Sequence, residues 1–272
     1  MNSGFLERQI QHRINVLKVS QNLSALHIGP AFSCVDIVDF IFYTLLQNQS
    51  SNDFILSKGH GAMALYAIQF SKGIITEDQF LSICQKNSNL GGHPDRGNPG
   101  VFASTGSLGH GLPIALGICL ARKERKIMKD IYLVLSDGEL MEGSNWEALL
   151  LAPSLGIKNI CIFIDHNKSI SRGNIDELHP NFLPIKEKLS IFGWEVEECD
   201  GHNQIDILQK YEQISAQSIK PRALVCNTVK GKGITFMENN PIWAYRSPNK
   251  EEYELAMGEL ENQLNEIKEN NK

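Results

Sequence analysis

Apolar residues along this chain follow two patterns, one with helical spacing and one of short continuous runs. In the stretch 35–46, apolar side chains recur every three or four residues, which predicts a helix. The run 131–136 is apolar on both faces, which is typical of a strand buried in a parallel sheet. The helices predicted in these ways are 35–46, 59–71, 112–126, 145–155, 181–192 and 203–218. The predicted strands are 131–136, 159–164, 194–198 and 222–229.

Predicted strands and helices alternate from residue 131 onward. Alternation of this kind predicts an α/β fold with a parallel sheet flanked by helices and joined by right-handed crossovers. The stretch 91–111 is rich in Gly, Pro, Ser and Asn and is predicted to be a loop. We found no internal repeat or low-complexity linker, so we expect a single domain spanning 1–272. Its core covers about 12–248, and a charged surface helix covers about 250–268.

Composition excludes several classes of function. The 272 residues carry a net charge of −5, so no basic surface is available for nucleic acid. The N-terminal stretch carries both signs of charge and lacks the apolar segment of a signal peptide, and the apolar runs are too short to cross a membrane. The six cysteines contain no CxxC pair, which argues against a zinc or redox site. We therefore expect a cytoplasmic protein that does not bind membranes.

The candidate chemistry follows two neighbouring predicted strands. Asp137 and Gly138 come directly after one strand, and Asn167 follows the next. Ligands in parallel α/β sheets bind at the carboxyl ends of the strands, where these loops meet. Carboxylate, amide and carbonyl oxygens suit Mg²⁺ held against a diphosphate, and a glycine lets backbone approach phosphate oxygens. Taken singly, the Asp-Gly pair is more often a turn and the asparagine a cap.

Together the two loops resemble the thiamine diphosphate motif, in which GDG is followed by Asn after a helix and a strand. Here the first glycine is Ser136. The resemblance implies a diphosphate-side thiamine diphosphate-binding domain, with Mg²⁺ (or Ca²⁺ or Mn²⁺) bound to Asp137, Asn167 and the Ser169 carbonyl. It also assigns Gly138, Glu139 and Asn167 to cofactor binding.

The histidines and one glycine-rich run narrow the resemblance to the transketolase family. His27 (ALHIGPAFS), His60 (SKGHGAMALY), His93 (GGHPD) and the run STGSLGHGLPIALG match that family in order, from about His12 to Pro248. By this resemblance the three histidines are catalytic, and His60 also contacts the cofactor. Imidazoles titrate near neutrality and can bind sugar hydroxyls and move protons. The residues implied to line the cofactor's aminopyrimidine are Gly106, Ser107 and Leu108, and Glu142 is implied to bridge subunits.

The resemblance also implies what this chain lacks. Long transketolases continue into a pyrimidine-binding domain, for which there is no room after Pro248. We therefore expect the N-terminal subunit of a two-chain transketolase, which moves a two-carbon ketol unit from a ketose to an aldose in an α₂β₂ assembly with a C-terminal subunit. Two enzyme alternatives remain, an α-type subunit of a 2-oxo acid dehydrogenase or decarboxylase and a 1-deoxyxylulose-phosphate synthase-like enzyme. The ketol-binding histidines His60 and His93 argue against the first.

One departure from the family pattern concerns the segment NPIWAY. Ala244 stands where the family has a histidine, and alanine can neither donate a hydrogen bond nor carry a proton. Compensation by Tyr245 or a partner residue, a different donor, or an impaired site would each explain it. The departure also favours a further alternative, a non-catalytic homologue that acts as scaffold or regulator. The intact Asp137, Asn167 and Glu142 argue against that alternative.

Overall fold

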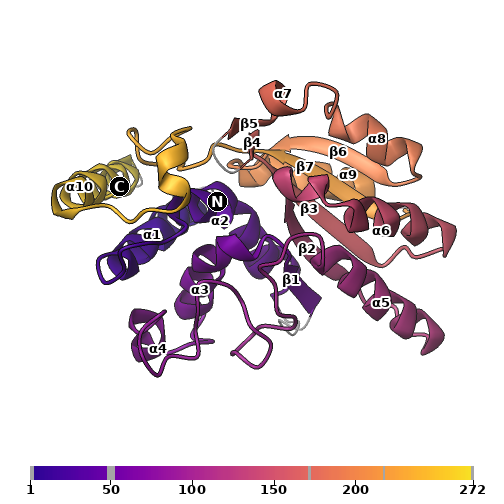
Figure 1. Cartoon of the computed structure of the whole chain (residues 1–272), viewed down its shortest axis with the longest axis horizontal. Helices are drawn as coiled ribbons and strands as arrows, with labels where there is room; N and C mark the ends of the chain where they lie inside the picture. Colours follow the sequence, from indigo (N-terminus) through magenta and orange to yellow (C-terminus); the bar gives the residue numbers. More distant parts are fainter. Residues whose placement is uncertain (1–2, 48–52, 171–172, 217, 271–272) are drawn as a thin grey trace.

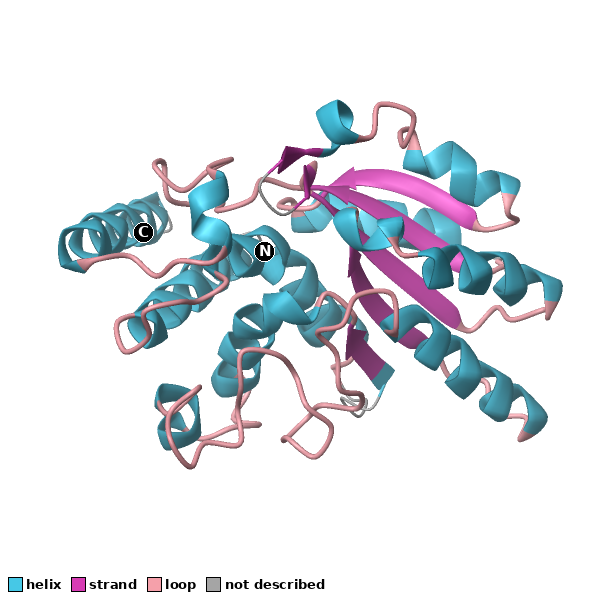
Figure 2. Ribbon diagram, in the orientation of Figure 1, coloured by secondary structure: helices cyan, strands magenta, loops and turns pink. Residues whose placement is uncertain are grey.

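A computed structural model describes residues 3–47, 53–170, 173–216 and 218–270. The strands are β1 (Phe54–Leu56), β2 (Ile131–Ser136), β3 (Ile160–His166), β4 (Ser169–Ile170), β5 (Gly173–Asn174), β6 (Glu195–Asp200) and β7 (Arg222–Asn227). The α-helices are α1 (Ser3–Ser20), α2 (Ile28–Phe40), α3 (Ala62–Ser71), α4 (Glu77–Leu81), α5 (Gly111–Glu124), α6 (Gly143–Ser154), α7 (Ile175–Leu178), α8 (Ile185–Ile191), α9 (Gln204–Ser215) and α10 (Lys250–Asn270). Within the described residues, five strands form a parallel sheet in the order β1-β2-β3-β7-β6 (Figures 1 and 2).

The sheet separates two apolar layers. Alternate residues of β2 and β3 point to opposite faces, so Leu133 and Ile162 pack with α5, α6 and α8, while Val134 and Phe163 pack with α2, α3 and α9. Figure 1 shows α5 and α6 on the near side of the sheet and α9 behind it. Helix α10 lies beside α1, away from the sheet. Burial on both faces explains why these strands read as continuous apolar runs.

The predicted α/β fold with a flanked parallel sheet is confirmed, and most predicted elements lie within a few residues of the observed ones. Several features differ, and helices α1, α4 and α7 have no predicted counterpart. Helix α2 begins seven residues before the predicted start and continues into a π-helical turn, Ile41–Leu45. Strand β1 was not predicted, because its three residues are too few to establish a pattern. The small antiparallel pair β4–β5 was also missed.

Among the described residues, one helical stretch is long and apolar enough to span a membrane by length and composition alone. It is Ile28–Leu45, formed by α2 and the π-helical turn, and 83% of it is buried inside the molecule. Every residue of α2 is buried, with α1, α3, α9 and the sheet packed around it. This stretch is therefore the central helix of the fold, and its apolar character reflects burial by protein.

A buried ion pair joins the ends of the strands. The Lys58 ammonium, in the segment after β1, contacts the Asp165 carboxylate on β3, and both side chains are fully buried. The Ser33 hydroxyl of α2 donates to Asp165 over 2.6 Å, the Thr228 hydroxyl after β7 donates to the same oxygen, and Lys58 also donates to the Pro30 carbonyl. Burial would raise the pKa of Asp165, but the Lys58 charge and these hydrogen bonds hold it below its ordinary value. The pair thus joins three strand ends and one helix.

Breaking this pair should strongly destabilise the fold. Lys58→Met leaves the Asp165 carboxylate buried without its counter-ion, so we expect the free energy of unfolding in urea to fall by about 3–5 kcal/mol. The matched control, Lys186→Met, removes an ion pair that is partly exposed to solvent and should change stability by less than about 1 kcal/mol. Adding Asp165→Asn to Lys58→Met should recover part of the loss. A Lys58→Met protein within about 1 kcal/mol of wild type would contradict this account.

Candidate active site

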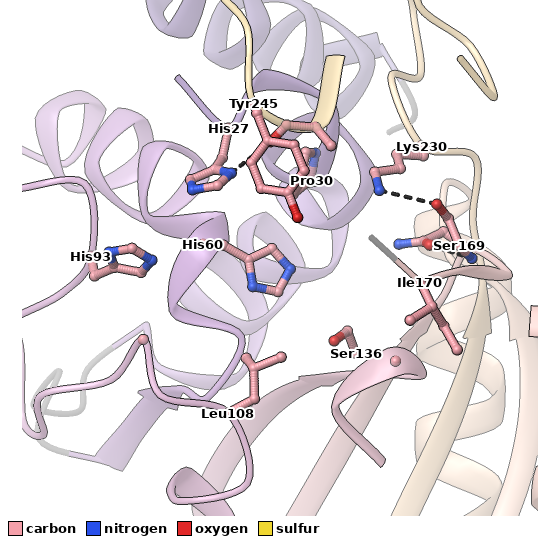
Figure 3. A pocket seen from close by; sticks show the side chains of 14 residues that line it. His27, Pro30, His60, His93, Leu108, Ser136, Ser169, Ile170, Lys230 and Tyr245 are labelled. Carbon is pink, nitrogen blue, oxygen red and sulfur yellow. Dashed lines mark hydrogen bonds between the residues drawn. The ribbon is translucent and has the colours of Figure 1, made fainter. Parts of the chain in front are cut away.

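The predicted site residues meet in a cavity at the carboxyl end of the sheet (Figure 3). Its volume is about 190 Å³. Binding sites that enclose a drug-sized ligand are usually about 300–1,000 Å³, so this cavity is small for a complete site. The described residues that line it are His27, Pro30, His60, His93, Gly106, Leu108, Ser136, Gly138, Asn167, Ser169, Ile170, Lys230, Ala244 and Tyr245. Eight predicted site residues are among them, and they come from segments far apart in the sequence.

Asp137 links the two predicted metal-binding loops. Its side chain is fully buried and accepts hydrogen bonds from the Gly138 and Lys168 amides, each over 2.7 Å, and from His166 Nδ1 over 3.0 Å. The loop after β2 is thereby fastened to the loop after β3. Two carboxylate oxygens offer about four acceptor positions, so these three donors leave capacity for a cation. The predicted meeting of the two loops is confirmed.

The amide of Asn167 is held in one orientation by the buried ion pair. Its Nδ2 donates to Asp165 and to the Ser33 hydroxyl, each over 3.1 Å. Its Oδ1 accepts from the Ser169 amide over 3.0 Å. Because both nitrogen hydrogens are used on the protein side, the amide oxygen is the group available to a ligand. The described residues contain no cluster of three or more His, Cys, Asp or Glu, so a metal here would need amide and backbone oxygens beside the Asp137 carboxylate.

Lys230 is a site residue that sequence reasoning missed. It follows β7, lines the cavity, and donates from Nζ to the Ser169 hydroxyl over 3.0 Å (Figure 3). Burial, and then the nearby Lys58 charge, lower the pKa of Lys230 to about 8. An anion in the cavity would stabilise the charged form of this ammonium. Its position after a third parallel strand was the available signal, because such positions face the ligand edge of the sheet.

The three predicted catalytic histidines form one cluster. The His27 ring lies 6.1 Å from the His60 ring and 5.7 Å from the His93 ring, both in edge-on geometry. His27 Nδ1 donates to the Ala244 carbonyl over 2.6 Å, since a carbonyl can only accept. In the neutral ring, Nε2 is then a hydrogen-bond and proton acceptor. The cluster comes from the start of α2, the start of α3 and the loop 91–110.

Burial keeps two of these imidazoles neutral. It is the main cause that lowers the pKa of His27 below the ordinary value of 6.5, against the opposing effect of the Ala244 carbonyl. Burial, followed by the Lys58 charge, lowers the pKa of His60 further. Near neutral pH both rings therefore have an unprotonated nitrogen that can accept a proton or bind a hydroxyl.

The glycine-rich loop lies at one wall of the cavity. Gly106 has φ +140°, and a Cβ there would lie 3.0 Å from the His93 ring, so the loop and the ring fit only with glycine. Gly106 and Leu108 line the cavity, whereas the predicted cofactor residue Ser107 between them is exposed to solvent. The exposed wall is the side at which a second protein surface could complete the site.

Four predicted residues are not part of the cavity lining, namely Asp137, Ser107, Glu139 and Glu142. Glu139 is buried beneath the loop, where it accepts hydrogen bonds from the Ser57 hydroxyl and from the Gly109 and Ser136 amides. Burial raises the pKa of Glu139 to about 7. Glu142, predicted to bridge subunits, is exposed at the start of α6. In this chain Glu139 therefore supports the wall of the site.

Comparison with known proteins identifies the family. Residues 7–252 match the family described as transketolase, thiamine diphosphate binding domain. The chain belongs to this family.

Its relatives include both short and long transketolases. The chain is 36% identical over 264 residues to a subunit of the apulose-4-phosphate transketolase of Actinobacillus succinogenes, covering 94% of this chain and 95% of that protein. It is 32% identical to a 6-deoxy-6-sulfo-D-fructose transketolase subunit of Clostridium sp., covering 94% and 98%. Human transketolase is 30% identical over 93% of this chain but only 41% of its own length. In length, this chain therefore matches the transketolase subunits and covers less than half of human transketolase.

Solved structures show the same fold. Transketolase from Campylobacter jejuni superposes with a TM-score of 0.87 at 24% identity, covering 98% of this chain and 46% of that one. In this transketolase-family fold, the residues around the cavity suit the diphosphate of the cofactor. Lys230 offers a positive charge, Gly138 leaves the backbone uncovered, and Asp137, Asn167 and Ser169 offer oxygen atoms for a cation.

Removing the Lys230 charge should weaken cofactor binding. We expect Lys230→Met to raise the Kd of the isolated chain for thiamine diphosphate with Mg²⁺ roughly 10- to 100-fold, as measured by calorimetry, because a charge-assisted hydrogen bond to the diphosphate is lost. Lys232→Met is the matched control, since Lys232 is 41% exposed and pairs with Glu238. Equal affinities for the two variants would remove Lys230 from the cofactor site.

Proposed function

We propose that this chain is the diphosphate-side subunit of a two-chain transketolase, which transfers a two-carbon ketol unit from a ketose or ketose phosphate to an aldose. The observation that carries the proposal is that one cavity joins an anion-binding end, with Lys230 and Asn167, to the histidine cluster around His27. A diphosphate and a polyhydroxylated substrate can therefore lie next to each other. Membership of the transketolase family supports the same reaction.

The residues divide into two groups by chemistry. When bound, thiamine diphosphate supplies the carbon nucleophile that cleaves the ketose. Gly138, Asn167 and Lys230 would hold and orient the diphosphate, and Asp137, Asn167 and the Ser169 carbonyl would hold Mg²⁺. His27, with its acceptor Nε2, takes up a proton from a substrate hydroxyl, and His60 and His93 bind the substrate hydroxyls beside it.

The partner in this proposal is a C-terminal transketolase subunit that carries the pyrimidine-binding domain, joined in an α₂β₂ assembly. Its proposed contact surface is the outer face of α5 and α6. On α5, the stretch 111–121 has no charged residue, and its exposed face presents Ile114, Gly117 and Ala121. On α6, Leu150 and Leu151 are 54% and 46% exposed. Exposed apolar side chains gathered on two adjacent helices are typical of a protein interface.

This face continues into the wall of the active site. Helix α5 begins just after Leu108, which lines the cavity, and α6 begins at the exposed Glu142. The Ser144 hydroxyl of α6 donates to the Gly109 carbonyl over 2.7 Å, joining the two helix starts. A second protein bound here would cover Ser107 and Glu142 and close the open side of the cavity. The short relatives are themselves named as subunits of transketolases, which supports such a partner.

We further propose that the chain acts as one domain in the cytoplasm. Both apolar layers pack on the same sheet, which supports a single unit over 1–272 with its core at about 12–248. All six cysteines are free thiols, which fits a reducing compartment.

The assay is ketol transfer from xylulose 5-phosphate with thiamine diphosphate and Mg²⁺, using this chain alone and with the candidate partner encoded beside it. We expect activity only with the partner. We expect Asp137→Ala to abolish Mg²⁺-dependent cofactor binding by the isolated chain, while circular dichroism shows an intact fold. Binding as tight as that of wild type would contradict the metal assignment, and a complex that binds cofactor without transferring ketol units would contradict the function.

The contact surface can be tested separately. Leu151→Asp places a charge in the proposed interface, so we expect partner affinity to fall more than 10-fold, as measured by native mass spectrometry and calorimetry. Cofactor binding by the isolated chain should not change. Ile219→Asp is the matched control, because Ile219 is 80% exposed and precedes β7, at the opposite end of the sheet. Undiminished assembly of the Leu151→Asp chain would place the interface elsewhere.

A further inference from the structure

Tyr245 is a cavity residue to which neither the motif nor the described contacts assign a function. It follows the short 3₁₀ turn Pro241–Ala244, and its side chain lines the cavity. Its ring packs edge-on against His27 with 5.4 Å between ring centroids. Figure 3 shows the hydroxyl projecting into the cavity next to the His60 ring. Tyr245 therefore presents a polar atom inside the site.

The ring of Tyr245 and its hydroxyl group lie in different surroundings. The ring covers one side of His27, whose Nδ1 is already held by the Ala244 carbonyl. Among the residues that the structure describes, none hydrogen-bonds the Tyr245 hydroxyl. A phenol that turns toward a cavity usually finds a partner when the cavity is filled, because its O–H both donates and accepts. The side chain is 47% exposed, so this hydroxyl is free to exchange solvent for a ligand that enters the cavity.

The location indicates which ligand. Tyr245 contacts His27, the centre of the histidine cluster, whereas the anion-binding end is marked by the Lys230–Ser169 hydrogen bond. The neighbouring Ala244 adds only a methyl group to the cavity lining, so the polar side chain that this segment offers is the phenol. A neutral phenol suits a sugar hydroxyl, with which it can exchange both a donated and an accepted hydrogen bond.

We propose that Tyr245 is a specificity-determining residue whose hydroxyl binds a hydroxyl of the donor ketose. This inference rests on the proposed function. The ring packs against His27, and the hydroxyl contributes binding of the donor. Ala244 has no polar side chain, so this segment contacts the donor through Tyr245.

The test separates donor binding from cofactor binding and from turnover. Tyr245→Phe keeps the ring on His27 and removes only the hydroxyl. In the complex with the partner, we expect kcat/KM for xylulose 5-phosphate to fall about 10-fold, which is the effect of one lost hydrogen bond to a ligand. The Kd of the isolated chain for thiamine diphosphate should stay within about twofold of wild type, since no cofactor contact is removed. Tyr253→Phe on α10 is the matched control and should alter neither quantity.

A second measurement does not depend on turnover. The complex is loaded with a thiamine diphosphate analogue that cannot react, and the Kd for xylulose 5-phosphate is measured by calorimetry. We expect Tyr245→Phe to raise this Kd about 10-fold. An unchanged donor Kd, or an equal loss of cofactor affinity, would overturn the assignment of Tyr245. Donor binding without ketol transfer by the wild-type complex would instead contradict the proposed function.

Discussion

The buried contact between Lys58 and Asp165 is the interaction on which the site depends. Two charges out of water cost several kcal/mol each, so the pair persists only because Pro30, Ser33, Thr228 and Asn167 satisfy the remaining hydrogen-bonding positions. These partners belong to the start of α2, the end of β7 and the loop after β3. The buried pair and its hydrogen bonds therefore hold together the separate segments that line the cavity.

The same pair sets the electrostatics of the cavity. The charge of Lys58 is neutralised by Asp165. Among the residues described, the ammonium of Lys230 has only a hydroxyl partner, and it lies at the cavity. Burial, and then the charge of Lys58, lower the pKa of both Lys230 and His60. The arrangement favours an anion at one end and neutral imidazoles at the other. A diphosphate and a sugar require those two environments.

The fold and the meeting of the loops after β2 and β3 could be predicted from the sequence because their signals are local, whereas the histidines were predicted from a family resemblance. Runs such as 131–136 are apolar on both faces, and Asp137 and Asn167 sit directly after strands, where parallel topology brings them together. Lys230 was missed because a lysine after a strand is common, and only the pairing of β7 with β3 places it beside Ser169. The support function of Glu139 could not be predicted either, since Ser57 and Gly109 reach it from distant segments.

The substitution at Ala244 shows how a side chain and its backbone can serve different purposes. The Ala244 carbonyl holds His27 in the tautomer that leaves Nε2 as the acceptor, and any residue at this position supplies that carbonyl. If the histidine that the family resemblance implies is replaced by alanine there, the proton acceptor of His27 is undisturbed and the lining of the cavity changes. With Tyr245 next in the chain and packed on His27, the segment remains a polar wall of the site. The alanine therefore argues for a change of donor recognition and gives no reason to infer a site without catalytic function.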